Sequence, residues 1–286
     1  MTHSIYPGTS IGTVHLKVAD LERSIPFYRD VIGLKVLRQE ADVAELTADG
    51  KRPLLTLRQI AGGLAMPKRS TSGLYHFAIL VPDRRSLGLS LRRLVEHRIR
   101  IGSSDHLVSE ALYLDDPDGN GIEIYADRPR DEWKHLPNGD IAMAVDPLDL
   151  DDLLMQAGDL PWTGLHPDTT IGHIHLHVSD LNRTWKFYGG VLGFDLVARM
   201  GNAALFVSAG GYHHHIGLNV WAGVGAPTPP DHAVGLSYYD VVIPDRQELE
   251  ATINRVRSTG IPVQEHDGGW MLKDPSGIGI RLTAGE

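Results

Sequence analysis

The chain has 286 residues, and its 42% hydrophobic and 22% charged content is typical of a globular protein long enough for two domains. Its net charge of -9 and its lack of a basic block argue against a nucleic-acid partner, and it has no apolar run of the roughly 18 to 20 residues that a membrane-spanning helix needs. The first residues predict no secretory signal and the chain has no cysteine, which fits a cytoplasmic protein without disulfides, Fe–S clusters or thiol nucleophiles.

Four segments of the chain begin in the same way. The sequence IGTVHLKVADL at 11–21 returns as IGHIHLHVSDL at 171–181, and a weaker pair reads LYHFAILVPD at 74–83 and LSYYDVVIPD at 236–245. Each predicts a strand that leads into a helix, because its closing aspartate is a typical helix N-cap. These aspartates are Asp20, Asp83, Asp180 and Asp245, and glycines typical of helix ends follow at Gly33, Gly193 and Gly260.

Further predicted strands complete each module as a β-α-β-β-β unit, with the turn Asp-Pro-Asp-Gly-Asn-Gly at 116–121 in the second module. Residues 128–170 break the pattern and are the predicted linker, in which 146–150 could cap a short helix. A single module would expose a hydrophobic face, so modules should pair. We therefore predict an α+β fold of four βαβββ modules: modules one and two at 8–127, the linker at 128–170, and modules three and four at 171–285.

Repeated modules whose first strands read like H-x-x-x-x-V-x-D-L resemble the vicinal-oxygen-chelate superfamily, which includes glyoxalase I, fosfomycin-resistance proteins and extradiol dioxygenases. The resemblance covers nearly the whole chain apart from the linker and termini. It implies paired glyoxalase-like domains, in which two modules form a curved sheet around a metal that is bound from their first and last strands.

The family's first-strand ligand lies seven residues before the capping aspartate, a position that carries Thr13, His76, His173 and Tyr238 in the four modules. The last-strand position holds Glu123 in module two and Arg281 in module four. Only His76, Glu123 and His173 can form a divalent site, and two histidines with one carboxylate are the facial triad of non-haem Fe(II) oxygenases. The resemblance thus implies Fe(II), with Mn(II) as the alternative. We expect module two to pair with module three around the metal, and module one with module four around a vacant cup, whereas the usual extradiol layout places the metal in the two C-terminal modules.

Three further histidines lie on these first strands. His15 and His175 occupy equivalent positions in modules one and three, so we interpret them as structural or as supporting the metal ligands. His177 lies on the same strand face as His173 and could line the pocket.

A second pattern surrounds Glu123. Extradiol dioxygenases share a stretch that is matched here by His106, Leu112, Tyr113, the turn at 116–119 and Glu123, with Ser104 as a small departure. Module four keeps the turn but has neither the tyrosine nor the glutamate. The resemblance implies that Tyr113 and His106 bind substrate oxygens.

The triplet His213-His214-His215 stands where extradiol enzymes carry an acid–base histidine. His214 is the best match, although a register one residue later is open, and strand alternation would turn His213 and His215 to the opposite face. The triplet could also be a surface metal-binding patch. Tyr212, Trp221 and Trp270 are candidate aromatic walls.

The predicted function is extradiol cleavage of a catechol-type aromatic diol by O2, with no membrane partner and a possible homo-oligomer. One alternative is a glyoxalase-type lyase, which usually needs a fourth, acidic ligand that the strand HHIGLNVWAG does not offer. Another is a metal-free small-molecule binding or resistance protein. The sequence leaves catechol and hydroquinone substrates both open.

Overall fold

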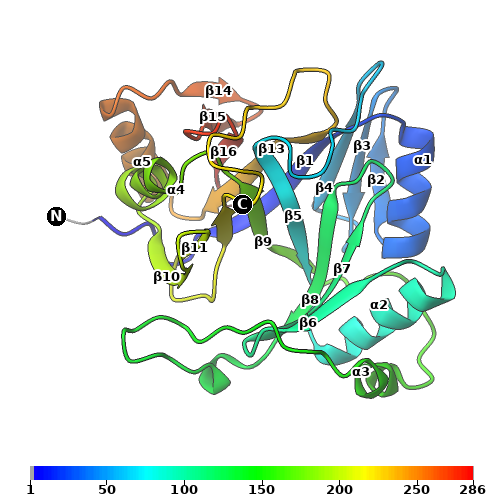
Figure 1. The fold of residues 1–286 in the computed structure, drawn as a ribbon. Coiled ribbons are helices and arrows are strands. Elements are labelled where there is room, and N and C mark those ends of the chain that lie inside the picture. Colours follow the sequence, from blue (N-terminus) through cyan, green and yellow to red (C-terminus); the bar gives the residue numbers. More distant parts are fainter. Residues whose placement is uncertain (1–2, 286) are drawn as a thin grey trace.

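The computed structural model describes residues 3–285, and its strands form two eight-stranded sheets (Figure 1). In order across the first sheet, the strands are β14 (Gln264–His266), β15 (Gly269–Lys273), β16 (Gly279–Ala284), β13 (Gly235–Ile243), β1 (Ser10–Val18), β4 (Leu55–Gln59), β3 (Val43–Thr47) and β2 (Lys35–Gln39). In order across the second, they are β10 (Asp195–Met200), β11 (Ala204–Ser208), β12 (Ile216–Asn219), β9 (Thr170–His177), β5 (Gly73–Leu80), β8 (Gly121–Asp127), β7 (Ser109–Asp115) and β6 (Gly102–Asp105).

This strand order confirms the predicted α+β fold of paired modules. Modules one and four share the first sheet through the antiparallel pair β1–β13, and modules two and three share the second through β5–β9. Each sheet therefore takes one module from each half of the chain. The boundaries predicted for the two domains and the linker stay a prediction.

The helices begin where the aspartates predict. They are α1 (Leu21–Pro26), α2 (Arg84–Glu96), α3 (Leu150–Ala157), α4 (Leu181–Trp185) and α5 (Arg246–Ser258), with π-helical η1 (Phe27–Ile32) and η3 (Lys186–Leu192) and the short 3-10 helix η2 (Arg130–Glu132). Asp20, Asp83, Asp180 and Asp245 each accept a hydrogen bond from a backbone N–H in the first turn, which satisfies a donor that has no partner within the helix. None of the helices within residues 3–285 is long and apolar enough to cross a bilayer.

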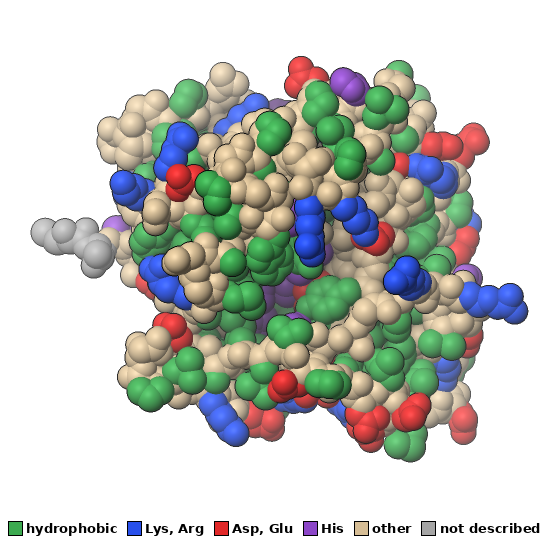
Figure 2. All heavy atoms as spheres, viewed as in Figure 1, with side chains coloured by type: hydrophobic (Ala, Val, Ile, Leu, Met, Phe, Trp, Pro, Cys, Tyr) green, Lys and Arg blue, Asp and Glu red, His purple; other side chains and the backbone are tan. Residues whose placement is uncertain are grey.

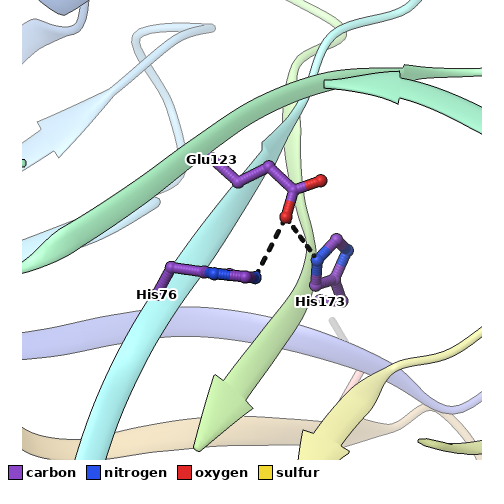
Figure 3. A group of neighbouring side chains, drawn as sticks. All are labelled: His76, Glu123 and His173. Atoms are coloured by element: carbon purple, nitrogen blue, oxygen red, sulfur yellow. Dashed lines mark hydrogen bonds and ion pairs between the residues drawn. The ribbon is translucent and has the colours of Figure 1, made fainter. Parts of the chain in front are cut away.

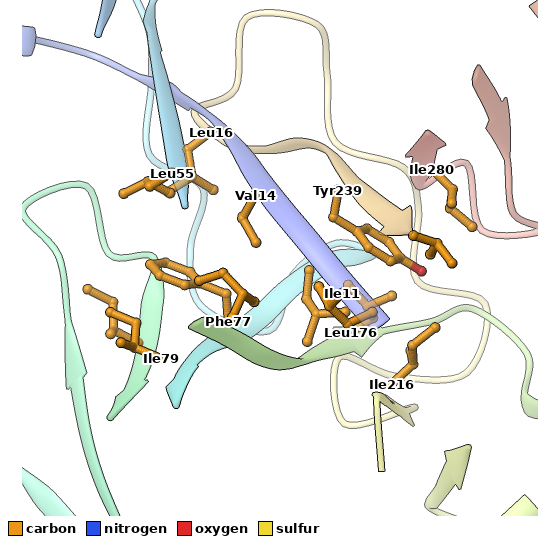
Figure 4. Close-up of a cluster of buried hydrophobic side chains, with 14 of the residues drawn as sticks. Ile11, Val14, Leu16, Leu55, Phe77, Ile79, Leu176, Ile216, Tyr239 and Ile280 are labelled. Carbon is orange, nitrogen blue, oxygen red and sulfur yellow. The ribbon is translucent and has the colours of Figure 1, made fainter. Parts of the chain in front are cut away.

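Side chains alternate along the central strands, and the apolar set faces the interior. Val14 and Leu16 of β1, Phe77 of β5 and Leu176 of β9 are almost completely buried in one core that both sheets share with the helices (Figure 4). Because successive strand residues point to opposite faces, the residues between these apolar ones face away from the core. That outer face of the second sheet carries the histidines of β5 and β9.

The linker lies against the second sheet and then returns to the helices. Its backbone pairs with β10 through Ile141 N to Val197 O at 3.0 Å, and with β6 through Asp146 and Asp105. The short helix predicted near 146–150 is α3, capped by Asp149 and packed against α2 (Figure 1). The linker is therefore a structured part of the module-two side.

The turn before β16 contains a buried carboxyl group. Asp274 accepts hydrogen bonds from the backbone N–H groups of Ser276 and Ile278 and from the Tyr188 hydroxyl, and burial raises its pKa to about 6. A carboxyl whose pKa is higher in the folded than in the unfolded state binds an extra proton when folded, so stability falls as the pH rises from about 4 to 6.

Asp274→Asn should remove this pH-dependent loss of stability, because an amide does not titrate in this range. The amide oxygen can still accept both backbone hydrogen bonds, so the turn is kept. Relative to the wild type, the variant should gain up to about 3 kcal/mol in the free energy of unfolding between pH 4 and pH 7. Urea unfolding at both pH values measures the change, with the exposed Asp131→Asn as reference. Parallel pH profiles for Asp274→Asn and the wild type would contradict the prediction.

Candidate active site

The predicted metal ligands surround one small residue in the second sheet. Ala78 of β5 is paired with Glu123 of β8 on one side and with His173 of β9 on the other, and His76 lies two residues before it on the same strand face. The methyl group of Ala78, which is itself buried, leaves the space above it to the three longer side chains. The pairing of module two with module three thus brings the three residues together.

Two glycines permit the close approach that this arrangement requires. A Cβ atom on Gly121, at the start of β8, would lie 2.1 Å from the carbonyl oxygen of Tyr75, so only glycine lets β8 reach this position beside β5. A Cβ atom on Gly172 would lie 1.7 Å from the hydroxyl of Tyr125, whose ring packs 4.7 Å from that of His173. Both glycines support ligand residues that are close in sequence.

The three side chains converge on one carboxylate oxygen (Figure 3). Nε2 of His76 and Nε2 of His173 each lie 3.0 Å from Oε2 of Glu123, and the ligand atoms of all three residues lie within 4.8 Å of one another. Two neighbouring ligands of an octahedral metal with bonds of about 2.1 Å are also about 3 Å apart. The Nε2 atom of His76 is buried and lies close to Glu123, but the angles between the two groups do not allow a hydrogen bond. A buried nitrogen without a hydrogen-bond partner is unusual, and a metal ion would supply that partner.

Electrostatics also suit a divalent cation. Burial disfavours the charged carboxylate of Glu123, but the neighbouring His173 and His76 outweigh burial and hold its pKa well below the ordinary value. Burial lowers the pKa of His173, which keeps this imidazole neutral. An ionised carboxylate and a neutral imidazole are the forms that bind metals, so Glu123 and His173 fit one.

A cavity of about 620 Å³ opens above the three residues, and histidine side chains are visible at the bottom of a hollow rimmed by hydrophobic groups (Figure 2). All six predicted site residues line it: His76, His106, Tyr113, Glu123, His173 and His214. Its walls are largely apolar and include Val108, Ile141, Met143, Phe206 and Trp221. A mostly apolar pocket with a few converging polar groups is typical of a small-molecule site.

Tyr113 and His106 form a hydrogen-bonded pair at one side of this cavity. Tyr113 is paired with Glu123 across β7 and β8, which explains the spacing of the sequence pattern. Nδ1 of His106 lies 2.7 Å from the carbonyl oxygen of Ala144, so it must donate there, and its Nε2 then accepts from the Tyr113 hydroxyl at 2.6 Å. Burial, followed by the charge of Glu123, raises the pKa of Tyr113 well above its ordinary value, so its hydroxyl stays protonated.

The histidine triplet lies in the loop before β12 and not in a strand, contrary to the prediction, but His214 and His215 still point to different places. His214 lines the cavity, and its ring centroid lies 4.1 Å from that of His173. Nδ1 of His215 instead accepts from the backbone N–H of Ala209 at 3.2 Å, away from the cavity. The triplet is buried or nearly so, which does not fit an exposed metal-binding patch.

A model of the Glyoxalase/Bleomycin resistance protein/Dioxygenase superfamily matches residues 10–124 and 170–282. The chain belongs to this superfamily. A catechol-2,3-dioxygenase from Bacillus subtilis (strain 168) is 55% identical over 273 residues, covering 95% of this chain and 96% of that protein. A biphenyl-2,3-diol 1,2-dioxygenase 3 from Rhodococcus globerulus is 32% identical over 118 residues, covering 39% of this chain and 60% of that protein.

Solved structures agree with this assignment at the level of the fold. Glyoxalase I from Zea mays has a TM-score of 0.57 at 17% identity, covering 97% of this chain and 92% of that one. The cppA protein from Streptococcus pneumoniae TIGR4 has a TM-score of 0.55 at 13% identity and covers all of both chains. At these identities the similarity concerns the architecture alone.

The position in the first sheet that corresponds to the cluster of His76, Glu123 and His173 contains an ion pair. Arg281, at the position of Glu123, donates to both carboxylate oxygens of Asp240, at 2.8 and 2.7 Å. The ring of His15 stacks on Tyr238 at 4.0 Å, and its Nε2 lies 3.4 Å from Asp240. The predicted vacant cup is therefore filled by side chains that neutralise one another.

The remaining candidates divide between the cavity and its surroundings. His175 lines the cavity, whereas His177 lines a neighbouring one. Nδ1 of His177 lies 2.6 Å from Oδ1 of the buried Asn219. Of the three candidate aromatic walls, only Trp221 is in the cavity lining. The prediction was wrong for Trp270, which lies in β15 of the other sheet, and Tyr212 is packed behind the site against Trp133.

Sequence reasoning missed the contribution of the linker. Residues 136–145 supply Leu136, Ile141, Met143 and Val145 to the cavity wall, and Ala144 supplies the carbonyl oxygen that orients His106. Residues 136–145 show no helical or strand periodicity, so their sequence carried no signal for this role. It forms one wall of the site.

Proposed function

We propose that the chain is an extradiol dioxygenase that cleaves a catechol-type ring with O2, at a mononuclear Fe(II), or alternatively Mn(II), bound by His76, His173 and Glu123. The observation that supports it most is that six residues assigned by three separate sequence features line a single cavity. The 55% identity with a catechol-2,3-dioxygenase over nearly all of both chains supports the same reaction.

Each group in the cavity then has a role. When bound, the metal supplies Lewis acidity and a path for electrons between diol and O2. His214 accepts a proton from a substrate hydroxyl and returns it as the ring opens, a task for which general acid–base catalysis contributes about 10²- to 10⁴-fold. Burial lowers the pKa of His214 well below its usual value, so it enters the reaction neutral and able to accept a proton.

Substrate binding combines one polar and one apolar side of the cavity. Tyr113 donates its proton to His106, so its oxygen, beside Glu123, is left to accept a hydrogen bond from a substrate hydroxyl. The apolar walls formed by Met143, Phe206 and Trp221 hold the ring and exclude water. The products are ring-opened semialdehyde acids. Whether the active protein is a homo-oligomer stays a prediction.

Anaerobic purification with metal analysis, followed by O2 uptake and visible spectra with catechol, substituted catechols and hydroquinone, tests the proposal. We expect about one iron or manganese ion per chain, catechol-dependent O2 uptake and a yellow semialdehyde. Zinc or nickel without O2 uptake would indicate a glyoxalase-type lyase instead. A protein that binds no metal would be a small-molecule binding protein.

A further inference from the structure

A chain of hydrogen bonds runs from the end of β8 to the cavity histidine. Nε2 of His213 lies 2.8 Å from Oδ1 of Asp127, and Nδ1 of His213 lies 2.8 Å from Nδ1 of His214. Glu123, Tyr125 and Asp127 alternate along β8 and point to the same face, so one strand carries both a proposed metal ligand and the start of this chain. Neither Asp127 nor His213 has a role in the reaction described above.

We propose that Asp127 and His213 are positioning residues, which fix the tautomer of His214 so that its Nε2 atom is the proton acceptor in the cavity. This inference rests on the proposed function of His214. An ionised carboxylate can only accept, so Nε2 of His213 carries a proton and donates it to Asp127. In this proposal His213 carries that single ring proton, so its Nδ1 atom is an acceptor, which obliges His214 to donate from Nδ1. The remaining nitrogen of neutral His214, Nε2, has a free lone pair.

The packing around these hydrogen bonds holds the side chains of His213 and His214 in place. His213 is completely buried, and its ring is flanked by Tyr212 at 4.1 Å and by Trp133 of the linker at 5.3 Å. The guanidinium of Arg130 covers the outer side of both aromatic rings. His214 itself lies between His173 and Phe206, at 4.1 and 5.2 Å between ring centroids. Among residues 3–285, no hydrogen-bond partner is found for Nε2 of His214, which leaves this atom to the substrate.

Asp127→Asn tests the inference, because an amide keeps the size of the carboxylate but can donate. The side-chain amide introduced by this substitution would donate to Nε2 of His213, which would reverse each hydrogen bond in the chain and move the His214 proton from Nδ1 to Nε2. We expect kcat for the diol to fall by at least about 10²-fold, while KM stays within about threefold and metal content is unchanged. Asp131→Asn, which removes an exposed carboxylate nearby, should behave like the wild type.

The tautomer of His214 can also be measured spectroscopically, without catalytic turnover. ¹⁵N spectra of histidine-labelled, Zn(II)-loaded full-length protein distinguish Nδ1–H from Nε2–H imidazoles, and the His214 signal is assigned from its loss in His214→Gln. We expect His214 to be the Nδ1–H form in the wild type and the Nε2–H form in Asp127→Asn. An unchanged tautomer, a kcat within twofold of wild type, or loss of the metal from Asp127→Asn would each overturn the inference. If no diol supports O2 uptake by the wild type, the proposed function fails, and the spectra still decide the tautomer.

Discussion

His173→Ala, His76→Ala and Glu123→Ala are each expected to abolish both metal binding and ring cleavage. The three ligand atoms converge within 4.8 Å, and removing one leaves two ligands, too few for a tight mononuclear site. Metal content of the purified protein should fall from about one ion per chain to less than about 0.1, since losing even an outer hydrogen-bond partner of a ligand costs about 10- to 100-fold in affinity. Metal analysis and O2 uptake on the same samples measure both effects.

His177→Gln is the matched control for these variants. It removes an imidazole that is buried on the same strand as His173 but faces the neighbouring cavity and contacts Asn219. It should keep the metal and the activity. Retention of metal by any two of the three alanine variants would refute the assignment of ligands, provided that circular dichroism shows them folded.

His214→Gln is expected to separate catalysis from metal binding. Because His214 packs on His173 without being one of the three converging ligands, the variant should keep about one metal ion per chain and lose about 10²- to 10⁴-fold in kcat. His215→Gln is the informative comparison, since its side chain is turned to the backbone of Ala209. Single-turnover and steady-state O2 uptake would measure the rates.

A large loss in His215→Gln with normal activity in His214→Gln would move the acid–base role by one residue. That result would agree with the alternative register that the sequence leaves open. It would also require the loop before β12 to rearrange when substrate binds.

The candidate metal site was predictable because the resemblance to the superfamily implies the ligand positions, and the helix caps show where in this sequence to count from. Asp83 and Asp180 can be recognised in the sequence, and counting back seven residues reaches His76 and His173, whose side chains then share the outer face of the sheet. Glu123 came from the last-strand position and the ring-cleavage pattern of the family that the chain resembles, and its pairing with Tyr113 explains that spacing. Local strand, cap and turn signals also predicted the four modules.

Features that depend on long-range placement were not predictable. The contact of His213 with Asp127 joins residues that are 86 positions apart, and neither belongs to a spaced motif. The linker wall arises because Ile141 pairs with β10 of the opposite half, a contact that no local pattern of residues 128–170 indicates. Trp270 was misplaced for the same reason, since aromatic character says nothing about which sheet a residue joins.

The two sheets make this single chain equivalent to a fused pseudo-dimer. Each half contributes one module to each sheet, and at the β5–β9 seam the N-terminal half carries the proposed ligands His76 and Glu123 while the C-terminal half carries His173. At the other seam, the ion pair of Arg281 with Asp240 occupies the equivalent position. Both seams join the halves through an antiparallel strand pair, but only one of them carries the proposed ligands. If the chain were cut within the linker, metal affinity would depend on protein concentration, because the site would exist only when both fragments associate.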